Sequence, residues 1–402
     1  MKIKVGVIFG GESVEHEVSI ITAVQAMEFL DKDKYEAIPI YISKDRTWYT
    51  GAQLKEMDIY RDFDLLKRYA KKVCLIKKDG KFCLQQINGL FKKVVTDLDI
   101  AFPIVHGKGV EDGTLAGLLE QIGIPFVGPK VMGASIGQDK VVQKQLLEAN
   151  NLPVVDYTWF YDYEYQTKKE EIVKNIESLG LPVIVKPALL GSSIGIEVVK
   201  ELDKLDEAIN EAIKYDTKIL VEKLIPNPLE VDCAVLGNYE RVETSLIGEM
   251  LTNNDFLTFE DKYISGGGKK GKMASKTSSI QTTGFEIPAT LDDKMKEEIY
   301  DLSKKAFRAL NLSGVTRFDF LVDRKNKKAY INEPNTIPGC LAFFFFTPKG
   351  KEYTDLLDEM ITLSIKEYKH SQTKVTSFES NVLSTYNSGA KTAKGKMAMK
   401  KN

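Results

Sequence analysis

The amino-terminal part of the chain alternates strand-like and helix-like segments, and this alternation restricts the fold more than any other feature. A strand, a crossing helix and a further strand form a βαβ unit, which places neighbouring strands parallel. The pattern therefore predicts an α/β fold that begins with a Rossmann-like parallel sheet. Strands are expected at residues 4–9, 37–42 and 98–105, and helices at residues 14–30 and 114–121.

The rest of the chain predicts two further units that contain both strands and helices. In the first, a helix at residues 139–149 precedes three strands, LPVIVKP, IGIEVV and KILVEKLI, which surround a helix at residues 204–213. In the second, strands at residues 231–236 and 242–246 precede a helix at residues 292–310 and a hairpin. We predict domains at residues 1–128 (Rossmann-like), 129–226 (α+β) and 227–369 (α/β, with the hairpin), and a polar, lysine-rich, disordered tail at residues 370–402.

The composition favours a soluble protein that finds its ligands through local groups. The 402 residues are 43% hydrophobic and carry a formal net charge of -1, so no global field attracts nucleic acid or anionic lipid. The first apolar run is too short for a signal peptide and no later stretch reaches membrane-spanning length, which predicts the cytoplasm. The four cysteines lack CxxC spacing, so we expect reduced thiols. A homodimer is compatible with the sequence, which does not fix the oligomeric state.

The segment GVTRFDFLVDRKNKKAYINEPNTIPG, residues 314–339, predicts a hairpin suited to metal-assisted phosphate chemistry. Side chains two apart share a strand face, so Arg317 and Asp319 lie together on one strand, and Glu333 and Asn335 on the other. A turn centred on Asn326 places Asp319 opposite Glu333. Two facing carboxylates repel each other, and Mg²⁺ with substrate phosphates would relieve the repulsion. The plainer alternative is a structural ion pair of Arg317 with Glu333.

Lys186 ends an almost wholly apolar strand and precedes a loop of small residues, Gly191-Ser192-Ser193. Backbone N–H groups of small residues can approach an oxyanion closely, so this loop and Lys186 predict a phosphate site. The alternative is an exposed lysine beside an ordinary turn. At the end of the first strand, Glu15 occupies the sheet edge where ligands usually bind, although an acidic residue there also suits a helix start.

Two familiar nucleotide motifs are incomplete in this chain. GGGKKGK at residues 266–272 matches GxxxxGK but is followed by Met273, where Ser or Thr would hold magnesium. It also lacks the flanking strand and helix, and we interpret it as a mobile loop. HGKGVEDG has the spacing GxGxxxG, and its Glu111 and Asp112 would repel a pyrophosphate, which argues against NAD.

Six segments, taken in order, resemble the successive signatures of D-alanine:D-alanine ligases, which are members of the ATP-grasp superfamily. They are GGESVEHEVS, HGKGVEDGT, VIVKPALLGSSIG, EDKY, TRFDF and INEPNTIPG, and the resemblance spans residues 1 to 368. It implies a three-domain ATP-grasp architecture. It also implies an ADP-forming condensation of two D-alanines through an acylphosphate, for peptidoglycan precursor synthesis. The implied ligands are ATP, D-alanine or another D-amino acid, and two Mg²⁺ or Mn²⁺ ions.

The resemblance also implies roles for individual residues. Glu15, His106, Arg317 and the Gly339 backbone would bind substrate and intermediate, while Ser192 and Tyr263 would join Glu15 in holding the site and its closing loop. Asp319, Glu333 and Asn335 would be the metal ligands. ATP would be bound by Lys140, Lys186, Ser192, Ser193, Glu222, Lys223, Leu224, Ile225, Glu230 and Lys262.

Two departures from the family pattern concern the acceptor and the lid. After Pro338-Gly339 the chain reads CLAFFFFTP, where the family has a serine that helps to hold the second substrate. The tyrosine-rich lid segment reads LTFEDKY and is followed by a long glycine- and lysine-rich stretch at residues 265–283. D-Lactate, D-serine or a bulkier acceptor, and a non-catalytic ATP-binding homologue, therefore stay open as alternatives.

Overall fold

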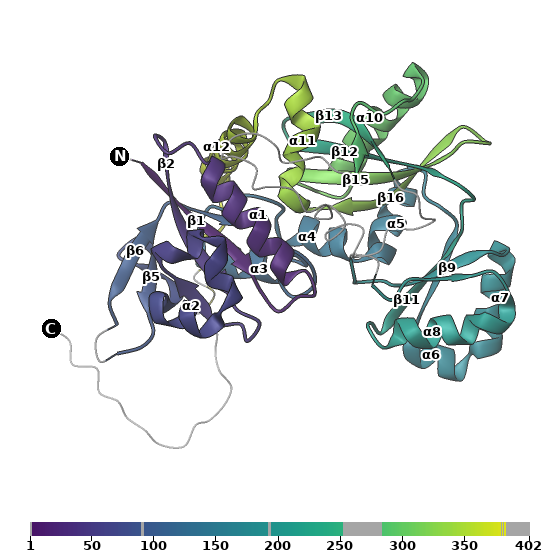
Figure 1. The fold of residues 1–402 in the computed structure, drawn as a ribbon, viewed down its shortest axis with the longest axis horizontal. Coiled ribbons are helices and arrows are strands. Elements are labelled where there is room, and N and C mark those ends of the chain that lie inside the picture. The colour runs from purple at the N-terminus through teal and green to yellow at the C-terminus, as the bar shows by residue number, and fades with distance from the viewer. Residues whose placement is uncertain are drawn as a thin grey trace, which may run out of the picture. The chain divides into compact units, whose positions relative to one another are not determined.

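The computed structural model describes residues 2–89, 92–191, 194–251, 284–378, 380 and 382 (Figure 1). The chain divides into one unit at Met1–Ile365 and a second at Lys366–Asn402, and apart from the end of the last helix everything below concerns the first unit. Among the described residues, no helix is long and apolar enough to cross a membrane. Several predictions lie outside the described residues: Ser192, Ser193, Lys262, Tyr263, the stretch 265–283 and most of the tail.

The first sheet contains the predicted parallel strands, but it is mixed rather than wholly parallel. Its order is β6-β5-β4-β3-β2-β1-β7, and only β2, β1 and β7 run parallel. The expected strand at 98–105 is interrupted at Asp99, whose carboxylate accepts the backbone N–H of Lys4 at 2.8 Å. The strands are β1 (Ile3–Gly10), β2 (Tyr35–Ile42), β3 (Trp48–Thr50), β4 (Lys71–Lys78), β5 (Lys81–Gln86), β6 (Val94–Leu98) and β7 (Ile100–Pro103).

Helices connect and cover these strands, and the predicted helices after β1 and β7 are both present. Helix α1 crosses from β1 to β2, and α3 ends at Gly123 with a left-handed φ of 84°. The elements are α1 (His16–Phe29), the 3₁₀ segments η1 (Ala52–Lys55) and η2 (Met57–Arg61), α2 (Phe63–Tyr69), α3 (Thr114–Ile122) and α4 (Val131–Gln138).

The second sheet has the order β10-β9-β11-β8, with every neighbouring pair antiparallel. One face packs on α7 and α8 through Ile176, Val185, Ile209 and other apolar side chains. On the other face Leu220 contacts Val141 of α5. The elements are α5 (Lys140–Ala149), β8 (Tyr157–Tyr161), α6 (Asp162–Thr167), α7 (Lys169–Leu179), β9 (Val183–Pro187), β10 (Glu197–Val199), η3 (Leu202–Lys204), α8 (Leu205–Ile213) and β11 (Lys218–Lys223).

The third sheet has the order β14-β13-β12-β15-β16, and its hairpin is the predicted one. Its apolar face packs against the amphipathic helix α10, for example through Val231, Phe318 and Ile299. The boundaries predicted near residues 128 and 226 stay a prediction. The elements are β12 (Leu229–Gly237), β13 (Val242–Met250), β14 (Phe285–Glu286), α10 (Asp293–Ala309), β15 (Gly314–Asp323), β16 (Lys328–Asn335), η5 (Gly339–Ala342), α11 (Phe343–Phe346), η6 (Thr347–Lys349) and α12 (Tyr353–Ser371).

Candidate active site

Polar side chains gather on the face of the third sheet that points away from α10. Strand registers place Asp232 of β12, Asp319 of β15 and Glu333 of β16 in one row, and Arg317 beside Asn335 in the next. Residues two apart on a strand share a face, so all of these side chains lie on one surface. The full set is Glu230, Asp232, Arg317, Asp319, Glu333 and Asn335.

A β-bulge sets the register of the hairpin. Next to the turn, Asp323 pairs with Lys328 and Phe320 with Ile331, whereas Asp319 pairs with Glu333. Strand β16 therefore holds one extra residue, Asn332, which shifts the pairing by one. The predicted facing of the two carboxylates is confirmed, but it depends on this bulge and not on a symmetric turn centred at residue 326.

Arg317 forms a two-point contact with Asp319 and also reaches Asp232. Its Nε donates to Asp319 Oδ1 at 2.7 Å and a terminal nitrogen to Oδ2 at 2.9 Å. Nε also lies 3.0 Å from Asp232 Oδ2, and Asp232 is only 1% exposed. The plainer alternative paired Arg317 with Glu333, whereas these ion pairs join Arg317 to Asp319 on its own strand and to Asp232 on β12. The sequence analysis missed Asp232.

The other facing carboxylate has a cation from a different part of the chain. Lys140, the first residue of α5, lies with its Nζ 2.7 Å from Glu333 Oε2. Burial alone would lower the pKa of Lys140, but the charges of Glu333 and Glu222 outweigh it and raise the pKa. Lys140 is therefore fixed as a cation beside the predicted metal ligands.

Lys186 and Glu222 meet in a buried ion cluster on the α5 side of the second sheet. Glu222 Oε2 contacts the Lys186 ammonium, while Oε1 lies 2.5 Å from the Nζ of Lys144. Burial alone would raise the pKa of Glu222, but the two lysines lower it to about 2. Burial, which is the largest cause, lowers the pKa of Lys144. Lys186 is thus no exposed strand-end lysine, and Lys144 is a member of the cluster that sequence reasoning missed.

The segment after β11 presents backbone groups beside this cluster. The N–H of Lys223 donates to Asp156 O at 2.9 Å and that of Leu224 to Pro182 O at 3.0 Å. Both bonds fix the path of the chain, and the next donor, the Ile225 N–H, makes no bond to a described residue. A free donor on a fixed backbone is suited to recognition of a heterocycle edge.

Glu15 lies against the backbone of two glycines. It is 9% exposed, and a β-carbon added to Gly107 or Gly191 would lie 2.8 or 3.3 Å from its Oε2. Gly191, the residue before Ser192, therefore lies beside Glu15. Ser192 itself is outside the described residues.

His106 and Gly339 lie near the contact between helix α1 and the segment that follows the hairpin. His106 Nε2 is 3.4 Å from Thr22 Oγ1, and the same oxygen accepts the N–H of Cys340 at 3.3 Å. Burial lowers the pKa of His106 to about 4, so its ring is neutral at neutral pH. A β-carbon on Gly339 would meet no atom of the described residues within 4 Å. The substrate roles of both residues stay predictions.

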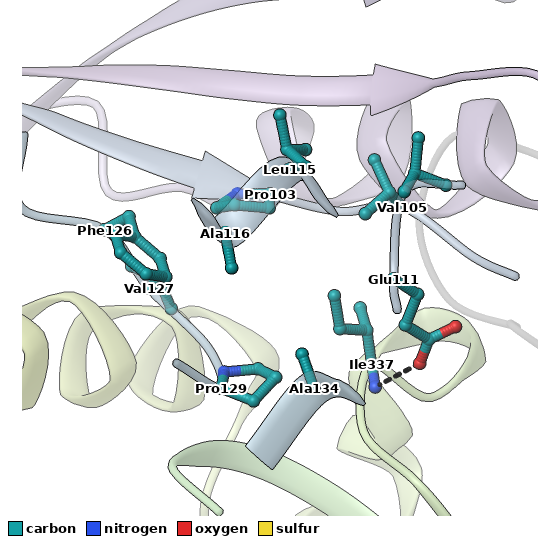
Figure 2. A pocket seen from close by; sticks show the side chains of 11 residues that line it. Pro103, Val105, Glu111, Leu115, Ala116, Phe126, Val127, Pro129, Ala134 and Ile337 are labelled. Carbon is teal, nitrogen blue, oxygen red and sulfur yellow. Dashed lines mark hydrogen bonds between the residues drawn. The ribbon is translucent and has the colours of Figure 1, made fainter. Parts of the chain in front are cut away.

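Glu111 is a further acidic residue, and sequence reasoning missed its contacts with the hairpin end. Its Oε1 accepts the Thr336 hydroxyl at 2.8 Å and the Ile337 N–H at 3.0 Å, and its Oε2 accepts the Gly107 N–H at 2.9 Å. Figure 2 shows the carboxylate at the edge of a small pocket with otherwise apolar lining. Burial, and then the charge of Glu15, raise the pKa of Glu111 to about 7. Glu111 therefore ties the 106–113 loop to the hairpin end.

The segment that departs from the family pattern has an unusual backbone. Cys340, Leu341 and Ala342 have φ angles of 51°, 50° and 52°, a left-handed turn of three non-glycine residues. Such a turn is strained for L-residues. It leads directly into α11, where Phe345 and Phe346 are fully buried while Phe343 and Phe344 are partly exposed. Phe343 stacks on Tyr353 and Phe344 packs against Phe285, so each keeps only part of its ring exposed.

The fold and this site define a protein of the ATP-grasp class. A mixed sheet with its helices precedes two antiparallel sheets, and the buried lysines of the second sheet and α5 accompany acidic side chains on the third.

Comparisons with known proteins give the family. Residues 4–129 match the model of the D-ala D-ala ligase N-terminus, and residues 146–362 that of the C-terminus. The D-alanine–D-alanine ligase of Thermosipho melanesiensis is 40% identical over 384 residues, covering 95% of this chain and 98% of the relative. That of Clostridium acetobutylicum is 37% identical over 373 residues, covering 90% and 98%. The chain belongs to the D-alanine–D-alanine ligase family and is an enzyme of this ligase kind.

Solved structures agree with this assignment. The D-alanine-D-alanine ligase from Coxiella burnetii has a TM-score of 0.75 at 29% identity, covering 92% of this chain and 96% of its own. The VanG D-Ala:D-Ser ligase from Enterococcus faecalis has a TM-score of 0.74 at 29% identity, covering 90% and 100%. The predicted ATP-grasp fold is confirmed.

Proposed function

We propose that the protein condenses two D-alanine molecules in an ATP-dependent, ADP-forming reaction that supplies peptidoglycan precursors in the cytoplasm. The first carboxylate attacks the γ-phosphate of ATP, and the second amine then attacks the acylphosphate and releases phosphate. The observation that supports this best is the row of Asp319 and Glu333, with Arg317 and Lys140 bound to them. This arrangement offers both metal ligands and fixed cations where phosphoryl charge develops.

The residues fit a divalent metal. Mg²⁺ takes one or two carboxylates with neutral oxygens and substrate phosphates, and Asp319, Glu333 and Asn335 are such a donor set. Asn335 would bind the metal through Oδ1. Its Nδ2, a donor that cannot bind a cation, is buried without a hydrogen-bond partner among the described residues and would donate to a phosphate oxygen. Within the described ranges no three His, Cys, Asp or Glu side chains form a metal cluster, so phosphate oxygens would have to complete the shell. When bound, Mg²⁺ or Mn²⁺, two ions by resemblance, would neutralise the phosphates of ATP.

Each remaining part of the site has a task in this scheme. Lys140 and Lys186 would bind phosphate oxygens, as would Ser192, Ser193 and Lys262. The backbone from Glu222 to Ile225 would hold the adenine and Glu230 the ribose. Arg317 would stabilise the oxyanion together with the Gly339 N–H, and Glu15 would bind the ammonium of the first D-alanine beside His106. Tyr263 and Ser192 would hold the closed site so that water does not hydrolyse the acylphosphate.

The test is to incubate the protein with ATP, Mg²⁺ and D-alanine and to measure ADP and dipeptide. Both should accumulate in equal amounts and only when all three components are present. Absence of turnover across a panel of D-amino acids would refute the proposal and favour a non-catalytic ATP-binding homologue. ADP release that substrate stimulates would eliminate that homologue in turn.

A different second substrate is the other candidate. It is supported by the strained turn at Cys340 to Ala342 and by the partly exposed Phe343 and Phe344 after Gly339. A D-Ala:D-Ser ligase is among the similar solved structures. D-Alanine should be mixed with D-serine, D-lactate and a bulkier D-amino acid at equal concentration. The mass of the dominant product then identifies the acceptor.

A further inference from the structure

One member of the buried ion cluster has no task in the proposed function. Lys144 lies one helical turn after Lys140 on α5, and its Nζ is 2.5 Å from Glu222 Oε1. We propose that Lys144 is a positioning residue that stays paired with Glu222, so that Lys186 can leave Glu222 and bind a nucleotide phosphate. The inference deepens the proposed function and rests on its ATP site.

Exposure separates the roles of the lysines. The Lys144 side chain is 1% exposed, whereas those of Lys186 and Lys140 are 11% and 12% exposed. A ligand that arrives from solvent can therefore touch Lys186 and Lys140 but not Lys144. Lys144 is dedicated to Glu222, and the other two are the lysines that can change partner.

The charge of Glu222 makes a dedicated partner necessary. Its side chain is 3% exposed, and its two oxygens contact one lysine each. A buried carboxylate that loses every cation is strongly destabilised, because neither water nor a counter-charge compensates it. With Lys144 in place, Glu222 keeps one ammonium when Lys186 moves. Without Lys144, Lys186 would be the one cation in direct contact with Glu222 among the described residues, and phosphate binding would have to break that pair.

One face of α5 contacts acidic residues of both the second and the third sheet. Lys140 contacts Glu333 on the third sheet and Lys144 contacts Glu222 on the second. Residues four apart on a helix point the same way, so one turn of α5 fixes the position of Glu333 relative to Glu222. A substitution at Lys144 should therefore affect the nucleotide side of the reaction and spare the site of Glu15.

The decisive measurement is the affinity of Mg·ADP by calorimetry, together with separate KM values for ATP and D-alanine. Lys144→Met keeps the apolar stem and removes the charge. We expect it to weaken Mg·ADP binding and to raise the KM for ATP at least about tenfold, while the KM for D-alanine changes less than about twofold. Lys351→Met is the matched control, because Lys351 is also largely buried and pairs with Glu243 at 2.9 Å and Glu359 at 2.5 Å. It should lower the free energy of unfolding without changing the affinity for Mg·ADP or the KM for ATP.

A double variant distinguishes positioning from a merely structural role. In Glu222→Gln the charge that Lys144 serves is absent, so adding Lys144→Met should change Mg·ADP affinity by less than about threefold. If the double variant binds much more weakly than Glu222→Gln, or if folded Lys144→Met binds like the wild type, the inference is wrong. Should Lys144→Met alone fail to fold by circular dichroism, the double variant still decides. Calorimetry does not require turnover, so a wild type that binds Mg·ADP without forming dipeptide would refute the proposed function separately.

Discussion

At the scale of single residues, burial and partners decide which charged groups the sequence could reveal. Asp319 and Glu333 were found because alternation along a strand is visible in the sequence and needs no knowledge of the fold. Asp232 was missed because its importance depends on the pairing of β12 with β15, which brings it opposite Asp319. Lys144 was missed because a lysine on a helix usually faces water, and only the packing of α5 on the second sheet buries it.

Glu111 gives a pH-dependent prediction at this scale. Its pKa is raised from 4.5 to about 7, so the folded protein prefers the protonated carboxyl. The stability that this group contributes is complete below pH 4.5 and is lost as the pH rises towards 7, by at most roughly 3 kcal/mol. Glu111→Gln is uncharged at every pH and should lack this loss. Urea unfolding of both proteins at several pH values from 4.5 to 8 measures the difference.

A parallel pH dependence of the two proteins would contradict this prediction. If the free energy of unfolding of the wild type and of Glu111→Gln changes in parallel over this pH range, Glu111 titrates normally in the folded protein. The hydrogen bonds to Thr336 and Ile337 would then be bonds to an ordinary carboxylate.

At the scale of elements, apolar periodicity predicted most helices and strands correctly, whereas one hairpin was missed because its turn signal was overlooked. The helices at 139–149, 204–213 and 292–310 and the strands beside them are present because apolar periodicity is strong there. The antiparallel pair β4 and β5 was missed although Asp79-Gly80 links Lys78 to Lys81, with φ angles of 50° and 76°. Asp-Gly between two strands is the typical two-residue hairpin signal. The lysine-rich flanks had hidden that signal, and the sheet was consequently expected to be wholly parallel.

Close packing of α4 gives the prediction for this scale. A β-carbon on Gly133 would lie 2.4 Å from the backbone oxygen of Asn311, which cannot move without shifting the chain. Gly133→Ala should therefore lower the free energy of unfolding by about 1–3 kcal/mol despite its better helix propensity. Gly117→Ala in α3 is the matched control, because the nearest atom would be 3.9 Å away. It should leave stability unchanged or raise it by up to about 1 kcal/mol, as urea denaturation can show.

At the scale of the whole molecule, the order of the motifs gave the family and the fold, whereas the site required tertiary contacts. The resemblance of the six motifs implied the ATP-grasp architecture, and the succession of one α/β and two further strand-rich segments agreed with it. The contact between Lys140 and Glu333 joins residues 193 positions apart, 333 minus 140, and no local pattern predicts it. It connects the lysine face of α5 with the acidic face of the third sheet, so ligand binding and folding of both should be coupled.

This coupling predicts how metal removal affects the protein. With Mg²⁺, a non-hydrolysable ATP analogue at about 100 times its Kd should stabilise the folded protein by about 2.7 kcal/mol. With EDTA in place of Mg²⁺, the triphosphate would meet the carboxylates of Asp319 and Glu333 with no metal ion between them, and most of this stabilisation should disappear. The thermal unfolding midpoint measures both. In Asp319→Asn the Mg²⁺-dependent part should shrink to near zero, and an equal shift with and without Mg²⁺ in the wild type would show that these carboxylates hold no metal.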